Sequence, residues 1–435
     1  MTGLKFKVED WIQGFDADPR RSETTAEFVL LIGDVPVTRL FDSWSRTVTD
    51  RARLPLFSMA EWFAANWWRL HAEAPYEGGQ PPTSWRLSHD LPAIGGGLVW
   101  PRVRFASDDS AIQVSARALR NAPWEPVRHL NDAPPEPVKI SEFDHAVDGL
   151  VDLVLERLSV LGISAEPLMS IWNNVKIERA DPDLTEWRRW EARLGYDPDE
   201  APEVLMAQIQ GLFSRVGKKA AAEVAPMLGE GASETLGGME RLSVSPGVVA
   251  TLPLCAKVRP DLEEAAPWEL GRTLARQVRA EIDRPGGLLS DRDLLNLLGS
   301  KENAFEQLTP SDATLGLGVR VPRKGKRSVD QTVLHFRKRN SAGVRFEAAR
   351  FVAESLIAPK EDTWLPLTDR ATARQKVQRA FAIELLAPIS EVAEQIGELR
   401  TPEVFEDLGD RYGVSALAIR SHLANHGLMM FDEVS

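Results

Sequence analysis

Hydrophobic residues recur every three or four positions through two segments in the C-terminal part of the chain, 344–356 and 373–388. This spacing places apolar side chains on one face of an α-helix, so each segment is predicted to be a helix. The second segment ends at Pro388, and proline commonly follows the last turn of a helix. The pattern therefore predicts two long helices in this region.

Short apolar runs separated by turn residues predict strands in the first part of the chain. Residues 27–38 are expected to form two strands joined by a Gly-Asp turn, and residues 99–115 a hairpin. Between them, residues 58–70 are predicted to form a helix that starts with a Ser and a Glu three positions later, as in a capping box. Residues 1–135 are therefore interpreted as an α+β domain, whose role the sequence leaves open.

The middle of the chain shows helical spacing and few strand signals. Residues 131–139 are rich in proline and are predicted to be a linker. Helices are expected over 140–230, with no catalytic signature, and the small residues of 229–238 predict a second linker. The C-terminal region, 240–435, is expected to be an α+β domain, which makes the whole chain α+β.

Basic side chains gather around two further predicted strands, 315–321 and 332–337. Asp330 is the one acidic residue among them. The patch could contact nucleic acid or an acidic partner, or its charges could protect an exposed hairpin edge from aggregation. The candidate binding residues are Arg323, Lys324, Lys326, Arg327, Arg337, Lys338 and Arg339.

Composition limits the classes of protein to consider. The chain has 435 residues, of which 43% are hydrophobic, and these values predict two or three domains with sizeable cores. A net charge of −12 argues against a protein that coats nucleic acid or membrane surfaces along its whole length. A single cysteine, Cys255, excludes a disulfide framework and favours a cytoplasmic location. No apolar run is long enough to predict a membrane span.

Two motifs in the predicted helices resemble the ImmA/IrrE family of zinc metallopeptidase-like proteins. Residues 345–349 read Arg-Phe-Glu-Ala-Ala, and residues 381–388 read Phe-Ala-Ile-Glu-Leu-Leu-Ala-Pro. In that family Arg-Phe-x-x-Ala opens a helix that carries His-Glu-x-x-His, and a second helix with a glutamate ligand ends in Phe-Ala-x-Glu-Leu-Leu-x-Pro. The resemblance covers about residues 245–435 and implies a zincin-like α+β fold. Members of the family include peptidases that cut repressors in phage-related and stress-response circuits.

The zinc motif itself is degenerate in this chain. His-Glu-x-x-His binds zinc through two imidazoles on one helix face, and its Glu acts as the general base. The five corresponding positions read Arg-Phe-Val-Ala-Glu, from Arg350 to Glu354. Arg350 stays charged and offers no lone pair to a cation, and Phe351 stands where the base would be. In the second helix, Gln375 and Gln378 occupy the region expected to supply the third ligand.

We therefore expect a degenerate zincin cleft formed by Arg350, Glu354, Gln375 and Gln378, without catalytic residues, metal or cofactor. In that cleft Arg350 would pair with Glu354, four residues away, or with a carboxylate from elsewhere. The alternative is that both residues are ordinary charges on a helix surface. The degenerate zinc motif therefore favours a protein without enzymatic activity over an enzyme.

The tail, residues 403–423, resembles a helix-turn-helix segment with its turn at Gly413. Its second helix has few basic residues, and in the ImmA/IrrE family a similar segment packs against the domain. His422 and His426 are four positions apart and could share a helix face like half of a zinc site. No acidic residue between them could serve as a base.

Three functional hypotheses follow. The first is a cytoplasmic regulatory or scaffold protein with a catalytically inactive ImmA/IrrE-like domain, which binds a protein partner in a phage-defence, toxin–antitoxin or stress-response circuit. The second is a nucleic-acid-binding regulator that uses the basic patch and the tail. The third is a metallopeptidase with relocated ligands. None of the three involves a membrane.

Overall fold

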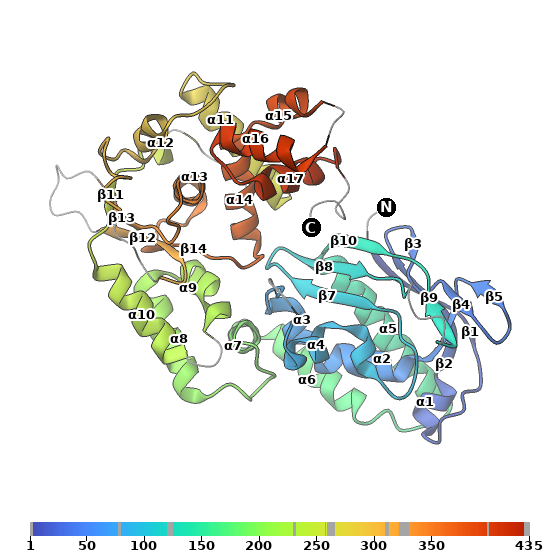
Figure 1. Cartoon of the computed structure of the whole chain (residues 1–435). Helices are drawn as coiled ribbons and strands as arrows, with labels where there is room; N and C mark the ends of the chain where they lie inside the picture. Colours follow the sequence, from blue (N-terminus) through green and yellow to red (C-terminus); the bar gives the residue numbers. More distant parts are fainter. Residues whose placement is uncertain are drawn as a thin grey trace. The chain divides into compact units, whose positions relative to one another are not determined.

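The computed structural model shows a chain that folds into two compact units, residues 1–206 and 207–435 (Figure 1). Helices and antiparallel sheets occur in both units, so the predicted α+β class is confirmed. The structure describes residues 3–76, 80–119, 125–228, 232–256, 258, 266–308, 313–321, 330–397 and 400–429, apart from the side chains of 232, 233, 255 and 256. The side chain of Cys255 thus lies outside the described part.

The described residues of the first unit form three antiparallel sheets and a set of helices around them. The sheets have the orders β1-β2-β3 with β6 also paired to β2, β10-β8-β7, and β5-β4-β9. The strands are β1 (Leu4–Trp11), β2 (Thr25–Ile32), β3 (Val35–Pro36), β4 (Leu40–Asp42), β5 (Thr47–Thr49), β6 (Ala52–Pro55), β7 (Val103–Ser107), β8 (Ala111–Ala116), β9 (Val127–His129) and β10 (Ala133–Lys139). The helices are α1 (Pro19–Glu23), α2 (Leu56–Ala65), α3 (Trp67–Ala72), α4 (Thr83–His89), α5 (Ile140–Val160), α6 (Leu168–Ala180) and α7 (Pro182–Arg193).

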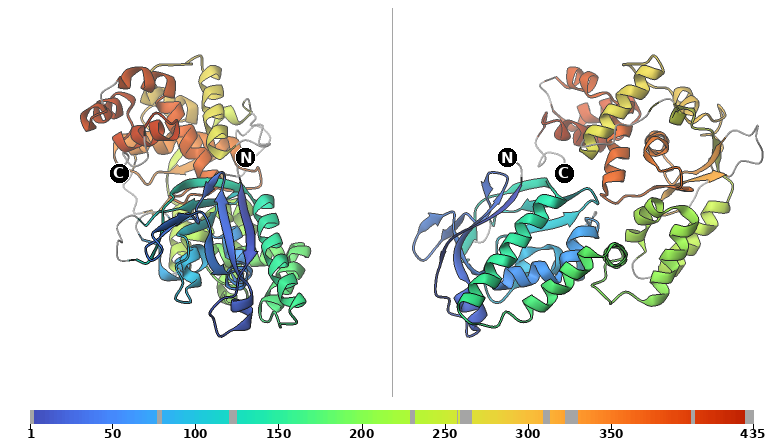
Figure 2. Two further views of the ribbon diagram at one scale, coloured as in Figure 1. Left: turned by 90° about the vertical axis from the view of Figure 1, so that its right-hand side faces the viewer. Right: turned by 180° about the vertical axis from the view of Figure 1, so that it is seen from behind.

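Aromatic side chains fill the core of the first unit. Phe63 of α2 contacts Phe105 of β7 and Phe143 of α5 edge-to-face, with ring centroids 5.3 and 6.0 Å apart. Edge-to-face contacts place the positive ring edge against the negative ring face, which stabilises such clusters. Helix α5 runs beside the sheet β10-β8-β7 (Figure 2). The core of this unit therefore joins the strands to the helices that follow them.

The predicted linker at 131–139 is wrong. Residues Ala133–Lys139 form β10, the edge strand that pairs with β8. Proline has no backbone N–H that could donate a hydrogen bond to a neighbouring strand. In an edge strand, however, one row of N–H groups has no neighbouring strand to pair with. The prolines of this segment are thus compatible with a strand at the edge of the sheet, although not with a central strand.

The second unit is organised around one four-stranded antiparallel sheet and the helix pair α13–α14. The strand order is β11-β13-β12-β14, with β11 (Val248–Ala250), β12 (Gly316–Val321), β13 (Gln331–His335) and β14 (Trp364–Leu367). The helices are α8 (Glu203–Val216), α9 (Lys218–Val224), α10 (Ala232–Val244), α11 (Pro267–Glu281), α12 (Asp291–Leu298), α13 (Ser341–Ile357), α14 (Ala373–Leu386), α15 (Ile389–Ile396), α16 (Pro402–Tyr412) and α17 (Ala416–Asn425).

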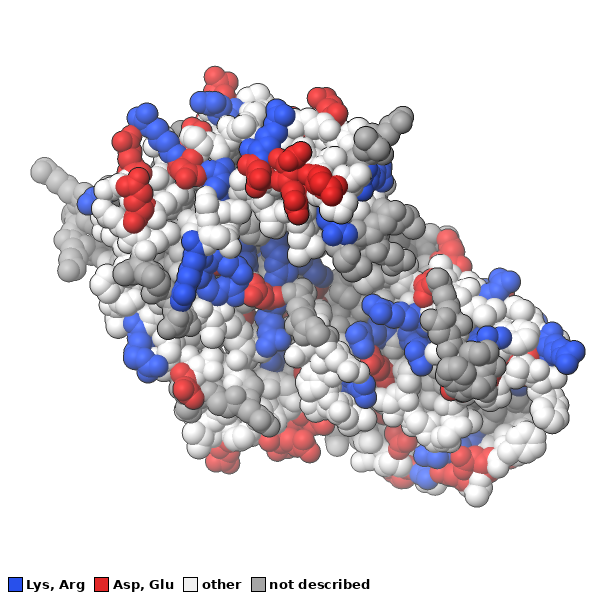
Figure 3. Space-filling view, viewed as in Figure 1, with Lys and Arg blue, Asp and Glu red and all other residues white. Residues whose placement is uncertain are grey.

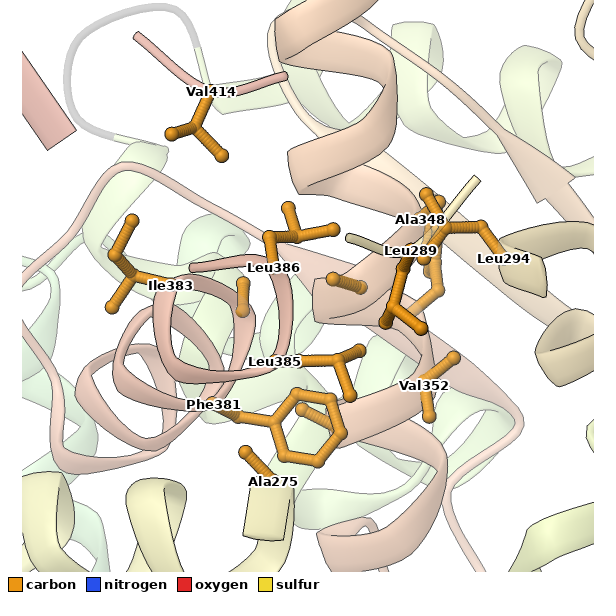
Figure 4. Packing of buried hydrophobic residues seen from close by; sticks show 14 of the residues in the cluster. Ala275, Leu289, Leu294, Ala348, Val352, Phe381, Ile383, Leu385, Leu386 and Val414 are labelled. Atoms are coloured by element: carbon orange, nitrogen blue, oxygen red, sulfur yellow. The ribbon is translucent and has the colours of Figure 1, made fainter. Parts of the chain in front are cut away.

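Helix α14 lies between α11 and α13. Phe381 and Leu385 of α14 fill the space between Ala275 of α11 and Val352 of α13 (Figure 4). The side chains of all four are 5% exposed or less. Helix α13 also packs against β14, which explains why its sequence has hydrophobic residues on more than one face.

The three expected regions do not coincide with the two units. Helices α5, α6 and α7 contribute to the hydrophobic core of the first unit, whereas α9 and α10 pack against β14 and β12 of the second. The predicted linker at 229–238 is also wrong in part, because α10 begins at Ala232. Within the described ranges, no helix combines the length and the apolar character that crossing a bilayer requires.

Candidate functional site

Helix α13 carries the five positions that would hold a zinc motif. Its N-terminus is capped by Asn340, whose side chain accepts a hydrogen bond from the Gly343 N–H. Burial on almost every side follows from its place against α12, α14 and β14. Arg350 and Glu354 are only 3% and 0% exposed, so the alternative that they are ordinary surface charges is wrong.

Neutral oxygens accept the hydrogen bonds of Arg350. Its Nη2 donates to the Thr368 carbonyl at 2.7 Å, to Gln375 Oε1 at 2.6 Å and to Gln378 Oε1 at 3.0 Å. Burial lowers the pKa of Arg350 to about 10, because a low-dielectric interior disfavours the charged form. The side chain is still a cation at neutral pH.

Glu354 pairs with an arginine that the sequence analysis missed. Arg374 of α14 donates from Nε to Glu354 Oε1 at 2.9 Å, and Gln378 Nε2 donates to Glu354 Oε2 at 2.6 Å. The expected pair of Arg350 with Glu354 is therefore wrong. Arg374 also donates to Asp362 Oδ2 at 2.8 Å. Burial would lower the pKa of Arg374, but these carboxylates outweigh it and hold the pKa above its usual value.

A third carboxylate enters from α9. Glu223 Oε2 accepts hydrogen bonds from Gln375 Nε2 at 2.8 Å and from Thr372 Oγ1 at 2.7 Å. We call the whole set the α13 polar network. Its members are Glu223, Arg350, Glu354, Asp362, Arg374, Gln375 and Gln378.

The four predicted cleft residues thus come together, but not as a cleft. Arg350, Glu354, Gln375 and Gln378 lie within the network, each between 0% and 3% exposed. Their polar atoms are directed at one another, which satisfies the requirement that buried charges be paired and hydrogen-bonded. At these positions the chain has a closed polar core, in which a partner could not reach the side chains.

An open pocket of about 410 Å³ lies instead at the start of α13. Its basic lining residues are Arg337, Lys338, Arg339 and Arg345, of which Arg345 is paired with Asp291. Apolar side chains, among them Phe305 and Phe336, line the remainder, together with two acidic residues. We call this feature the α13 pocket. Of the predicted basic patch, Arg323, Lys324, Lys326 and Arg327 lie outside the described residues.

Arg337 is largely neutralised. Its guanidinium donates to the Asp369 carboxylate at 2.5 and 2.9 Å and lies 3.6 Å from Glu347 Oε1. The hydrogen bond from Arg337 holds the pKa of Asp369 below its ordinary value. The side chains of Lys338 and Arg339 are exposed, so these two residues carry the accessible basic character of the pocket.

The tail forms two helices around a glycine turn, as predicted. Helix α16 ends at Tyr412 and is followed by Gly413, which adopts a left-handed conformation with φ of 64°, and Ser415 caps α17. Ile419 and Leu423 of α17 are fully buried in the core of the unit. Acidic side chains gather over α16 on the face shown in Figure 3, where they would repel phosphates.

His422 and His426 share one face of the tail and meet Glu384 of α14. His422 Nε2 lies 3.4 Å from Glu384 Oε2, and the two imidazole rings have centroids 4.9 Å apart. Burial lowers the pKa of His426 to about 4, and the charge of nearby Arg272 acts in the same direction. The spacing of the two histidines is evident in the sequence, whereas their proximity to Glu384, a residue of the motif at 381–388, depends on the packing of α17 against α14.

No family model, curated protein or solved structure matches this chain at a significant level. The resemblance to the ImmA/IrrE family therefore rests on the motifs at 345–349 and 381–388. The structure places these motifs on adjacent buried helices, α13 and α14. Membership of the family stays a prediction.

Proposed function

We propose that this chain is a cytoplasmic regulatory or scaffold protein, in which an ImmA/IrrE-like domain acts by binding a protein partner. On this proposal the domain serves a phage-defence, toxin–antitoxin or stress-response circuit. The observation that carries it is the α13 polar network, which fills the positions of the zinc motif with mutually satisfied side chains.

The network supports a role without peptidase chemistry on α13. A zinc peptidase needs three protein ligands and a fourth position open to water and substrate. Here the place of the first histidine is taken by Arg350, whose charge would repel the ion, and the place of the base by Phe351, which is fully buried. A closed, rigid core of this kind can support a binding surface nearby.

The α13 pocket is the surface that best fits a partner. Its volume of about 410 Å³ can accommodate one or two side chains of a bound segment. Lys338 and Arg339 favour carboxylates on that segment, and the phenylalanines favour an apolar residue between them. The proposed partner is accordingly a protein with a short segment that is acidic and partly apolar.

Nucleic acid has less support as the partner. Arg337 is held by Asp369 and Glu347, and α16 carries Glu403, Glu406, Asp407 and Asp410. Nucleic-acid binding gains free energy when protein cations neutralise phosphates and displace the counterions condensed on them, which requires cations that are not already paired with carboxylates. A nucleic-acid complex with steep salt dependence would favour this alternative over the protein partner.

Affinity capture with paired variants tests the proposal. The bait is the full chain, compared with a Lys338→Glu, Arg339→Glu double variant that reverses the charge at the pocket. A Lys301→Glu, Lys360→Glu double variant is the matched control, because both lysines are exposed, belong to the same unit and do not line the pocket. The captured candidate is then purified and its affinity measured by calorimetry.

The proposal expects the purified partner to bind the wild type and the control equally and the pocket variant at least tenfold more weakly. Equal affinity for all three would contradict the pocket assignment. Cleavage of the partner by the wild type that is lost on treatment with a chelator and restored by zinc would contradict the proposal as a whole, because it would identify a metallopeptidase with relocated ligands. Arg350 is not a suitable position for this test, because its substitution would disrupt the core.

A further inference from the structure

Three buried side-chain atoms, one from α14 and two from the C-terminal end of α17, converge without hydrogen bonds. Glu384 Oε2, His422 Nε2 and His426 Nε2 are each inaccessible to solvent and have no hydrogen-bond partner in the described part of the chain. Burial of one such atom costs free energy, and three at a single point are unusual in a folded protein. Glu384 and His422 are more than nine-tenths buried.

The separations of these atoms fit a metal ion. Each of the three residues offers one ligand atom, a carboxylate oxygen or an imidazole nitrogen, and these three ligand atoms lie within 4.8 Å of one another. Glu384 Oε2 and His422 Nε2 are 3.4 Å apart, whereas ligands on a tetrahedral zinc ion, at about 2.0–2.1 Å from the metal, are about 3.3 Å apart. Rotation of the half-buried His426 ring can shorten the remaining distances.

We propose that Glu384, His422 and His426 bind a divalent transition-metal ion. Two histidines at i and i+4 present their rings on one helix face, and a carboxylate from a second helix completes a set of two nitrogens and one oxygen. Zn²⁺ and Fe²⁺ both accept this set. The site is distinct from the α13 positions of the zinc motif, and it stands independently of the proposed partner binding.

The second layer of contacts supports one orientation of the carboxylate. Arg276 Nε donates to Glu384 Oε1 at 2.9 Å, which leaves Oε2 directed at the histidines. Hydrogen bonds of this kind orient metal ligands in known sites. Arg276 and Arg272 also place positive charge nearby, which lowers the affinity for a cation; the guanidinium of Arg272 is partly occupied by the Asn425 carbonyl, at 3.1 Å.

The ion would attach the tail to the core. Glu384 belongs to α14, and both histidines belong to the last turn and C-terminal end of α17. His422 is followed by Leu423, so the helix carries no general base at the place that a His-Glu-x-x-His motif gives it. The expected role is therefore structural, with the ion stabilising the position of α17.

Metal content of the purified chain tests the site. The protein is prepared without a metal-binding tag, stripped with a chelator, loaded with Zn²⁺ or Co²⁺ and passed over a desalting column. Wild type should retain about one ion per chain, and its Co²⁺ complex should show the strong visible absorption of a four-coordinate site. His426→Ala and Glu384→Gln should retain at least tenfold less metal.

Two controls keep the result interpretable. His145 is exposed on α5 of the other unit, and His145→Ala should bind as wild type does, which separates the site from binding by surface histidines. In chelator the His426→Ala variant should melt within a few degrees of the wild type, and zinc should raise the melting temperature of the wild type alone. Equal retention of metal by wild type and His426→Ala would overturn the proposal.

Discussion

At the scale of single residues, Arg374 is the cation on which the α13 polar network depends. It contacts Glu354 and Asp362, whose side chains are 0% and 1% exposed. A buried ion pair gains little over an apolar pair of similar shape, but the loss of one partner leaves the other as an unpaired buried charge. Two carboxylates would be left in this way.

Substitution of this arginine should be strongly destabilising. Arg374→Met is expected to lower the free energy of unfolding by about 3–5 kcal/mol, measured by chemical denaturation. The control is Arg215→Met, which breaks the exposed pair with Glu240 at 2.7 Å and should cost about 0–1 kcal/mol. Similar losses in the two variants would mean that the network is not a buried, closed unit.

His335 provides a test of burial by pH. It lies on β13, 5% exposed, and burial lowers its pKa below the ordinary 6.5. Below about pH 6.5 the unfolded chain binds a proton that the folded chain does not. The free energy of unfolding that buried, neutral His335 contributes is therefore fully present above about pH 6.5. It is lost as the pH falls towards the pKa of His335 in the folded chain.

The variant His335→Gln should weaken this pH dependence. Between pH 7.5 and pH 5.5 the melting temperature of the second unit is expected to fall less in the variant than in the wild type. Scanning calorimetry at the two pH values provides the measurement. An identical fall in both proteins would show that protonation of His335 does not reduce the stability of the folded chain.

The sequence predicted part of the candidate site at this scale. Arg350, Glu354, Gln375 and Gln378 follow from the motif positions, because both helices were identified. Glu223 and Asp362 could not be predicted, since they come from α9 and from the segment before β14, and their proximity depends on tertiary packing. Arg374 could have been predicted from the sequence, because it is a cation next to Gln375 on the helix expected to face Glu354.

At the scale of elements, the close approach of α11 and α14 depends on Gly271. A Cβ atom at this position would lie 2.5 Å from the Val377 carbonyl oxygen and 2.9 Å from Ala380 Cβ. Backbone atoms of α14 cannot move away without disturbing the core that Phe381 fills. Any side chain at this position must therefore separate the two helices.

We expect Gly271→Ala to reduce the free energy of unfolding by about 1–3 kcal/mol, as overpacking does. Gly211→Ala in α8 is the matched control. A Cβ there would meet no atom within 4 Å, so the better helix propensity of alanine should add about 0.5–1 kcal/mol. Thermal or chemical denaturation of both variants measures the difference, and the same sign for both would refute the close contact.

The elements themselves were predicted unevenly. Helices α13 and α14 carry clear periodicity, Gly413 marks the turn before α17, and the structure has these elements close to the expected bounds. Strand β10 and helix α10 were missed because proline and glycine usually mark loops. Pairing at a sheet edge and packing against β12 allow the observed structures in spite of these residues.

At the scale of the whole molecule, the chain consists of two units with separate hydrophobic cores. The composition predicted two or three domains, and the boundary between the two units falls near residue 206 and not at the proline-rich segment. The reason is that α5, α6 and α7 complete the core of the strands before them. The α13 polar network, the α13 pocket and the proposed metal ligands Glu384, His422 and His426 all belong to the second unit.

The most direct test of the account is an anomalous difference map from zinc-soaked crystals of the full chain, recorded at the zinc absorption edge. We expect a peak between Glu384, His422 and His426, and we expect Arg350 in contact with Gln375 and Gln378 without a peak beside them. A peak bound by Glu354 on α13 would contradict the claim that a closed polar network has replaced the metal centre there.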